Sequence, residues 1–146
     1  MSKRNDILEG LKDCLKNIST EKNFNTSPRD VVRKFVWFDQ VHSFPYLMVL
    51  GGNEPFEDEL GNTTLSRMAV KVVGYAKSME EPEKAQCDLI EDVLICLNDE
   101  EYNLQKSYMR ISGVETDEGM LHALGDGVSM FVGNLEMVFT FDRNSP

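Results

Sequence analysis

Long apolar runs, paired cysteines and an excess of basic charge are all missing from this sequence of 146 residues. No stretch approaches the ~20 apolar residues of a membrane-spanning helix. The charged start MSKRNDILEGLKD lacks the apolar centre of a signal peptide, so we expect no targeting segment. Cys14, Cys87 and Cys96 have no C-x-x-C spacing, which predicts reduced, structural thiols in a cytosolic protein.

The balance of charge limits the partners of the chain. Lysine and arginine number 15 against 25 acidic residues, which gives a formal net charge of -10. A nucleic-acid surface needs clustered basic residues that replace counterions on the phosphates. The composition therefore argues against specific nucleic-acid binding and against docking on anionic lipid.

Catalytic motifs are also missing. The sequence contains no P-loop, G-x-S-x-G, H-E-x-x-H or G-x-G-x-x-G pattern. His42 and His122 both fall in predicted loops, and Ser43 beside His42 is no triad signal, because neighbouring side chains rarely point at one another. We predict no catalytic residue, no cofactor and no enzymatic activity.

Two acidic clusters could offer carboxylates to a metal ion. The stretch 54–59 holds four carboxylates in six residues, but their spacing does not follow an EF-hand loop. Asp88, Glu91 and Asp92 share one face of a predicted helix, with no histidine nearby. A solvated loop tip and a solvated helix face are the favoured interpretations, and no metal site is predicted.

The stretch 64–77 has the clearest strand pattern in the chain. Alternating apolar and β-branched residues predict a strand with one face on a helix and the other, with Tyr75, towards water or a partner. Ser78-x-x-Glu81 then forms a capping box, which predicts a helix over 82–97 that folds back on this strand.

The remaining pattern predicts one more helix and four more strands. The helix covers 6–18, and the strands cover 31–38, 44–52, 105–114 and 127–141. Short, hairpin-like links favour an antiparallel sheet of about five strands, although a mixed sheet stays open. Two main helices on one face make this an α+β fold, expected as a single domain over 1–146.

The last strand shows a change of phase. Its first apolar residues alternate in one register and its later ones in the opposite register. A β-bulge at Gly133–Asn134 would restore a single inward face, because one extra residue reverses the side on which all later side chains point.

The order of these segments resembles the tail terminator, or tail completion, proteins of long-tailed bacteriophages. The similarity runs from Asp6 to Asp142, and its motifs stand in a set order. They are the helix DILEGLKDCLKNI, a strand near Val31, FPYLMVLGGNE, SRMAVKVVGYAKS, EEPEKAQCDLIEDVLICL, TDEG and GVSMFVGNLEMVFTFD.

The resemblance implies a structural role without catalytic residues. Terminators form a ring, usually a hexamer, that ends tail-tube growth and joins the tail to the head connector or neck. The implied partners are further copies of the chain, the tail tube protein and the connector. DNA would pass through the lumen without specific binding, in a virion tail assembled in the host cytoplasm.

A ring needs contacts between subunits, and two predicted loops offer them. The apolar residues there without an evident intramolecular stripe are Phe56, Leu60, Met120 and Leu121. The alternative is that these residues fold back on their own core.

Two other functions stay open. One is another neck or tube-like phage component, and the other is a small acidic binding module or a cryptic hydrolase. A hydrolase would need a pocket in which Asp39 or His42 meets convergent polar groups.

Overall fold

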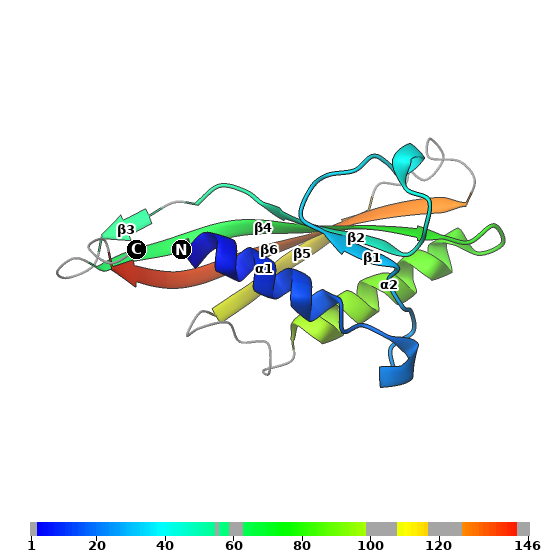
Figure 1. Cartoon of the computed structure of the whole chain (residues 1–146), viewed down its shortest axis with the longest axis horizontal. Coiled ribbons are helices and arrows are strands. Elements are labelled where there is room, and N and C mark those ends of the chain that lie inside the picture. Colours follow the sequence, from blue (N-terminus) through cyan, green and yellow to red (C-terminus); the bar gives the residue numbers. More distant parts are fainter. Residues whose placement is uncertain (1–2, 55, 59–62, 99–107, 117–126, 143–146) are drawn as a thin grey trace.

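The fold is built around two long strands that lie side by side and set the long axis of the molecule (Figure 1). In this computed structural model, the residues described are 3–54, 56–58, 63–98, 108–116 and 127–142. The elements in chain order are α1 (Lys3–Leu15), η1 (Thr20–Lys22), β1 (Asp30–Val32), η2 (Phe38–Gln40), β2 (Tyr46–Gly51), β3 (Phe56–Asp58), β4 (Thr63–Lys77), α2 (Pro82–Leu97), β5 (Tyr108–Thr116) and β6 (Val128–Asp142).

The strands form one mixed sheet in the order β1-β2-β4-β6-β5, and β3 pairs with β4. β4 and β6 pair antiparallel over 15 residues, from Thr63 opposite Asp142 to Lys77 opposite Val128. Among the described strands, only β1 and β2 run parallel. The predicted α+β fold, with a mostly antiparallel sheet and two main helices, is therefore confirmed.

Both helices cover one face of the sheet and enclose the main core. On β4, the residues Met68, Val70 and Val72 point into this core, as the alternation predicts. α2 contributes Leu89 and Val93 at helical spacing. The predicted bounds of α2 are confirmed, whereas α1 begins three residues before the predicted 6–18 and ends at Leu15.

The opposite face carries a second, smaller core. The strand predicted over 31–38 is wrong: only Asp30–Val32 is extended and paired, and residues 33–45 then cross the sheet. We call residues 33–45 the crossover segment. A parallel pair such as β1 and β2 cannot be joined by a tight turn, so the chain needs a connection of this length. The segment buries Val36 and Phe38 partly against Met48 and Tyr75.

The second core explains the change of phase in the last strand. The predicted β-bulge at Gly133–Asn134 is wrong, because β6 keeps one continuous register with β4. Val128, Met130 and Val132 face the second core, whereas Leu135, Met137 and Phe139 face the helices. Both sets are apolar because both faces of the sheet are covered. A register shift does occur, but in β5, between Ile111 and Gly113.

Three smaller expectations were also wrong. Tyr75 is buried in the second core instead of facing water. Asp92 is only 1% exposed, so it does not belong to a solvated helix face. The acidic loop includes the short strand β3, which pairs with Thr64–Ser66 of β4.

Candidate interaction surface

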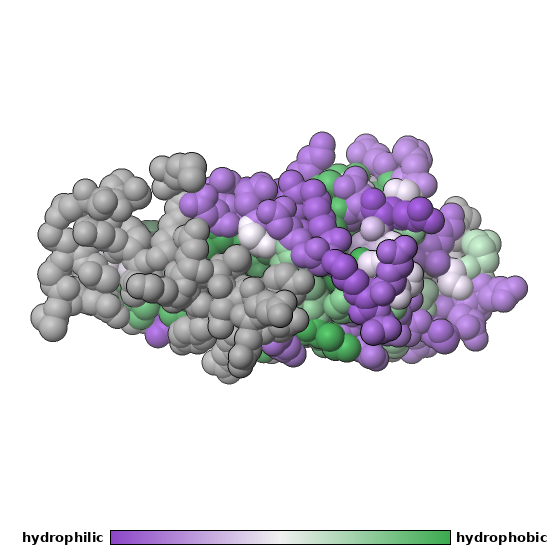
Figure 2. Space-filling view, turned by 60° about the horizontal axis from the view of Figure 1, so that its bottom comes forward, coloured by the Kyte–Doolittle hydropathy of each residue, from purple (hydrophilic) through white to green (hydrophobic). Residues whose placement is uncertain are grey.

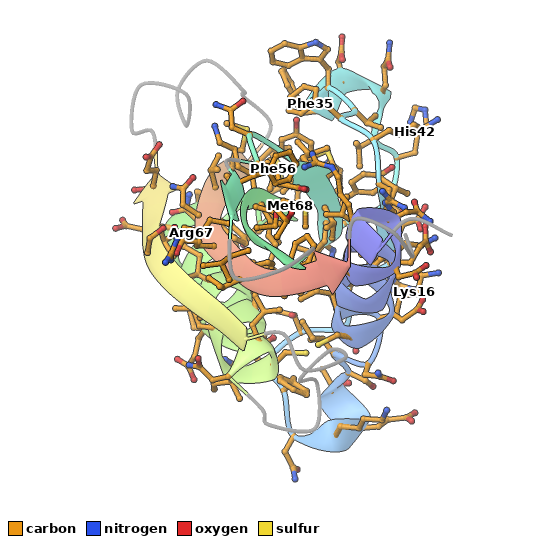
Figure 3. All side chains as sticks on the ribbon, turned by 90° about the vertical axis from the view of Figure 1, so that its left-hand side faces the viewer. Lys16, Phe35, His42, Phe56, Arg67 and Met68 are labelled. Carbon is orange, nitrogen blue, oxygen red and sulfur yellow. The ribbon has the colours of Figure 1, made fainter. Side chains whose placement is uncertain are left out.

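Phe56 is the one predicted contact residue that lies in the described part of the chain; Leu60, Met120 and Leu121 lie outside it. Phe56 begins β3, opposite Ser66 of β4, and its side chain is 58% exposed. β3 lies at the end of the molecule that faces the viewer in Figure 3, where Phe56 is labelled. That Phe56 contacts another subunit stays a prediction.

The crossover segment carries a second exposed apolar group that the sequence pattern did not reveal. Phe35 is 44% exposed and Trp37 is 56% exposed. Their rings meet edge to face, with centroids 5.0 Å apart. Figure 3 shows Phe35 on the far side of the sheet from α2. In the strand predicted over 31–38 these residues alternate with Val36 and Phe38, and in the structure Val36 and Phe38 are the ones that turn inward.

Buried contacts hold this aromatic pair in place. The Tyr75 hydroxyl donates to the carbonyl oxygen of Val36 at 2.8 Å, and the Val36 amide lies 3.2 Å from the Met48 sulfur. Burial, followed by the negative charge of Asp39 and the neighbouring Tyr46, raises the pKa of Tyr75 to about 12. Tyr75 therefore stays a neutral donor at physiological pH.

Ion pairs fasten the segments before and after β2 to α1. Arg33, at the start of the crossover segment, donates to Glu9 at 2.9 Å and also to Asn5. Arg4 pairs with Glu54 at 2.8 Å and donates to the carbonyl oxygen of Gly52. The hydrogen bond from Arg33, together with Lys12, lowers the pKa of Glu9 against the opposing effect of desolvation. These contacts tie the first helix to the segments on either side of β2.

Asp92 has a structural role in the helix layer. Its carboxylate accepts hydrogen bonds from the backbone amides of Asn25 and Thr26, at 2.9 and 2.7 Å, and from the Thr26 hydroxyl. These bonds hold the loop after η1 on α2. Within the described ranges, no group of three or more His, Cys, Asp or Glu side chains is placed to hold a metal ion.

The two edges of the sheet are formed by different strands. β6 is the only described strand that pairs with β5, so β5 presents its other side as an edge. At the register shift, the Ser112 hydroxyl donates to the Asn134 carbonyl oxygen at 2.9 Å. On the other side of β4 lie β1, β2 and β3, together with Phe56. An edge strand offers backbone groups with which another chain can pair.

The positions of Asp39 and His42 bear on the alternative of a hydrolase, which would need one of them in a pocket. Asp39 and His42 are both exposed, and Figure 3 shows His42 at the rim of the molecule. In the coloured part of Figure 2, the surface is mostly hydrophilic, with smaller apolar patches between the polar side chains. Neither helix in the described part of the chain has the length and apolar content needed to cross a bilayer.

A sheet edge on which no described strand pairs, together with exposed aromatic side chains elsewhere on the surface, is typical of a protein that works by contacting other proteins. A comparison with protein families identifies which kind. The family model described as Bacteriophage Tail Tube Terminator Protein matches residues 1–135, and the chain belongs to this family. No curated protein matches the chain. The resemblance seen in the sequence is thereby confirmed, and the protein is a structural component of a phage tail.

Proposed function

We propose that this protein forms a ring, a hexamer, on the last ring of the tail tube. The ring stops tube polymerisation and provides the surface to which the head connector or neck binds. The family match over residues 1–135 is the observation that carries this proposal. In it, the whole chain of 146 residues acts as one domain, without catalysis. Its partners are its own copies, the tail tube protein and the neck protein.

The arrangement of the sheet supports a closed ring. A ring needs head-to-tail contacts, in which two different surfaces of the subunit meet. β5 lies at one edge of the sheet, whereas β3 with Phe56 lies on the other side of β4. A contact between the β5 edge of one copy and the β3 side of the next would repeat around an axis.

The net charge of the chain supports a ring lumen that does not bind DNA. The net charge of -10 leaves the ring strongly acidic, so DNA would be repelled from its wall and would pass without specific binding. Assembly in the host cytoplasm and a final place at the head end of the tail follow from this proposal.

Tube growth in the presence of the protein tests the proposal. The tail tube protein is polymerised with and without this chain, and tube lengths are measured by negative-stain microscopy. We expect shorter tubes with a ring of six subunits at one end. Unchanged lengths with no bound ring would refute the capping role, and incorporation along the tube would favour a neck or tube-like component instead.

Variants at Phe56 test the subunit contact. Phe56→Asp should leave the monomer folded but weaken ring formation, because a charge replaces an exposed apolar side chain at the proposed contact. Phe56→Leu keeps an apolar side chain and serves as the matched control. Leu121→Asp should act in the same way, and Leu60 and Met120 belong to the same proposed surface. Native mass spectrometry reads the oligomer, and unchanged assembly in both Asp variants would contradict the contact.

Trp37 supplies a direct readout of assembly. It is the only tryptophan in the chain and is 56% exposed in the subunit. If the crossover segment enters a contact with a neighbour or with the tube, its fluorescence should shift to shorter wavelength. A spectrum that stays the same in fully assembled rings would place Trp37 outside the contact.

A further inference from the structure

Two buried thiols meet where the two helices touch. Cys14 is the next-to-last residue of α1, and Cys96 is the next-to-last residue of α2. Their Sγ atoms lie 3.3 Å apart, and neither side chain is more than 2% exposed. Cys96 also lies 3.3 Å, through its sulfur, from the carbonyl oxygen of Cys14. Both residues are thiols in the structure, and the exposed Cys87 stands apart from them.

We propose that Cys14 and Cys96 form a site of oxidative modification, at which a disulfide joins α1 to α2 within one subunit. The Sγ atoms need to approach by about 1.3 Å to reach a bond length of about 2.0 Å. Both cysteines lie in the last turn of a helix, and a helix end opens locally at a lower free-energy cost than the whole subunit unfolds. This opening admits an oxidant that burial otherwise keeps out.

The oxidant is a low-molecular-weight disulfide such as oxidised glutathione. One cysteine thiolate attacks a sulfur of this disulfide and releases one small thiol. The second cysteine thiolate attacks the mixed disulfide and releases the other small thiol. Each cysteine proton passes to a departing thiolate. Two protein thiols and one small disulfide thus become one cystine and two small thiols, and no further electron acceptor is needed.

The bond would stabilise the subunit because it closes a long loop. The two cysteines are 82 residues apart, and a disulfide that closes a longer loop removes more entropy from the unfolded chain. Conditions inside a host cell keep thiols reduced, whereas a virion outside the cell meets oxidising conditions. The subunit would then gain stability after its release. The proposal does not depend on ring formation, since both thiols belong to one subunit.

The full-length protein with Cys87→Ser is incubated with oxidised glutathione, and its non-reduced digest is analysed by mass spectrometry. Replacing Cys87 removes the exposed thiol that would form dimers. We expect a linked peptide pair containing Cys14 and Cys96, and an intact mass lower by two hydrogen atoms. The Tm should rise by roughly 5–15 °C and return to its starting value with a reductant.

Single variants provide the controls. Cys14→Ser and Cys96→Ser, each in the Cys87→Ser background, should lose the rise in Tm on oxidation. If either variant fails to fold, the linked peptide from the parent protein still decides the question. Two unmodified thiols after prolonged oxidation, or a linked pair found only after denaturation, would overturn the proposal.

Discussion

Gly74→Ala should destabilise this protein although it adds a single methyl group. Gly74 lies near the end of β4, three residues before Lys77, and is paired with Leu47 of β2 on one side and with Phe131 of β6 on the other. A Cβ at this position would meet the Phe131 ring at its Cε1 and Cζ atoms, the latter at 2.7 Å, and the Leu47 Cδ2 atom at 3.0 Å. Phe131 and Leu47 are both buried, so neither can move away into solvent.

The magnitude follows from two opposing effects. Overpacking a close-packed core costs about 1–3 kcal/mol. Replacing glycine by alanine at an unstrained position returns about 0.4–1 kcal/mol, because the unfolded chain loses freedom. The clash is with a rigid ring, so we expect a net loss of about 1–2 kcal/mol in the free energy of unfolding. For a chain of this size, the loss should lower the Tm by roughly 2–8 °C.

Urea denaturation followed by circular dichroism measures the effect. The midpoint should fall while the slope stays unchanged, which indicates a change in stability alone. Gly113→Ala is the matched control, because a Cβ there has no heavy atom within 4 Å. Gly113→Ala should change stability by less than about 1 kcal/mol. A Gly74→Ala protein as stable as the Gly113→Ala protein would refute the role of Gly74 as the space for the Phe131 ring.

Three further predictions concern buried polar groups and a turn. Asp92→Ala should lower stability by about 1–3 kcal/mol, because it removes a buried charged acceptor from the backbone amides of Asn25 and Thr26. Asp88→Ala, at a partly exposed ion pair, should cost less than about 1 kcal/mol, and urea midpoints measure both losses. The pKa of Tyr75 is raised from 10.0 to about 12, so the folded protein keeps a proton that the unfolded chain loses between these values. The stability that the neutral Tyr75 hydroxyl contributes is complete below pH 10 and is lost as the pH rises towards 12. The Tm should therefore fall across this pH range, and Tyr75→Phe should make this fall smaller. Gly127→Ala should destabilise the folded protein, because Gly127 has φ +73° and an added Cβ would crowd the Ser78 carbonyl group. Amide hydrogen exchange at this end of β4 and β6 should become faster. Unchanged protection from exchange would contradict the prediction.

Residue patterns alone were enough to predict the frame of the fold. Alternation over 64–77 and helical spacing over 82–97 identified β4 and α2, but Tyr75 and Asp92 are buried where the pattern placed them towards solvent. These signals are local, since each depends on a period of two or of 3.6 residues. The family could also be predicted from the order of the motifs, and the match over residues 1–135 confirms it.

The candidate surface was predicted only in part. Phe56 was chosen because an apolar residue stood among carboxylates, and it is exposed on β3. Phe35 and Trp37 were missed because their alternation with Val36 and Phe38 is the same in a strand and in a segment that crosses a sheet face. Nothing in the local pattern distinguishes these two arrangements.

The sequence by itself determined the long strand β4, the two main helices, the acidic charge and the membership of the terminator family. Only the tertiary structure decided which apolar residues belong to which face, because both faces of the sheet are covered and both sets of side chains are apolar. The same holds for Asp92 and for the pair Cys14 and Cys96. Their partners lie 66 to 82 residues away in the chain, and contacts at such separations exist only once the helices have packed on the sheet.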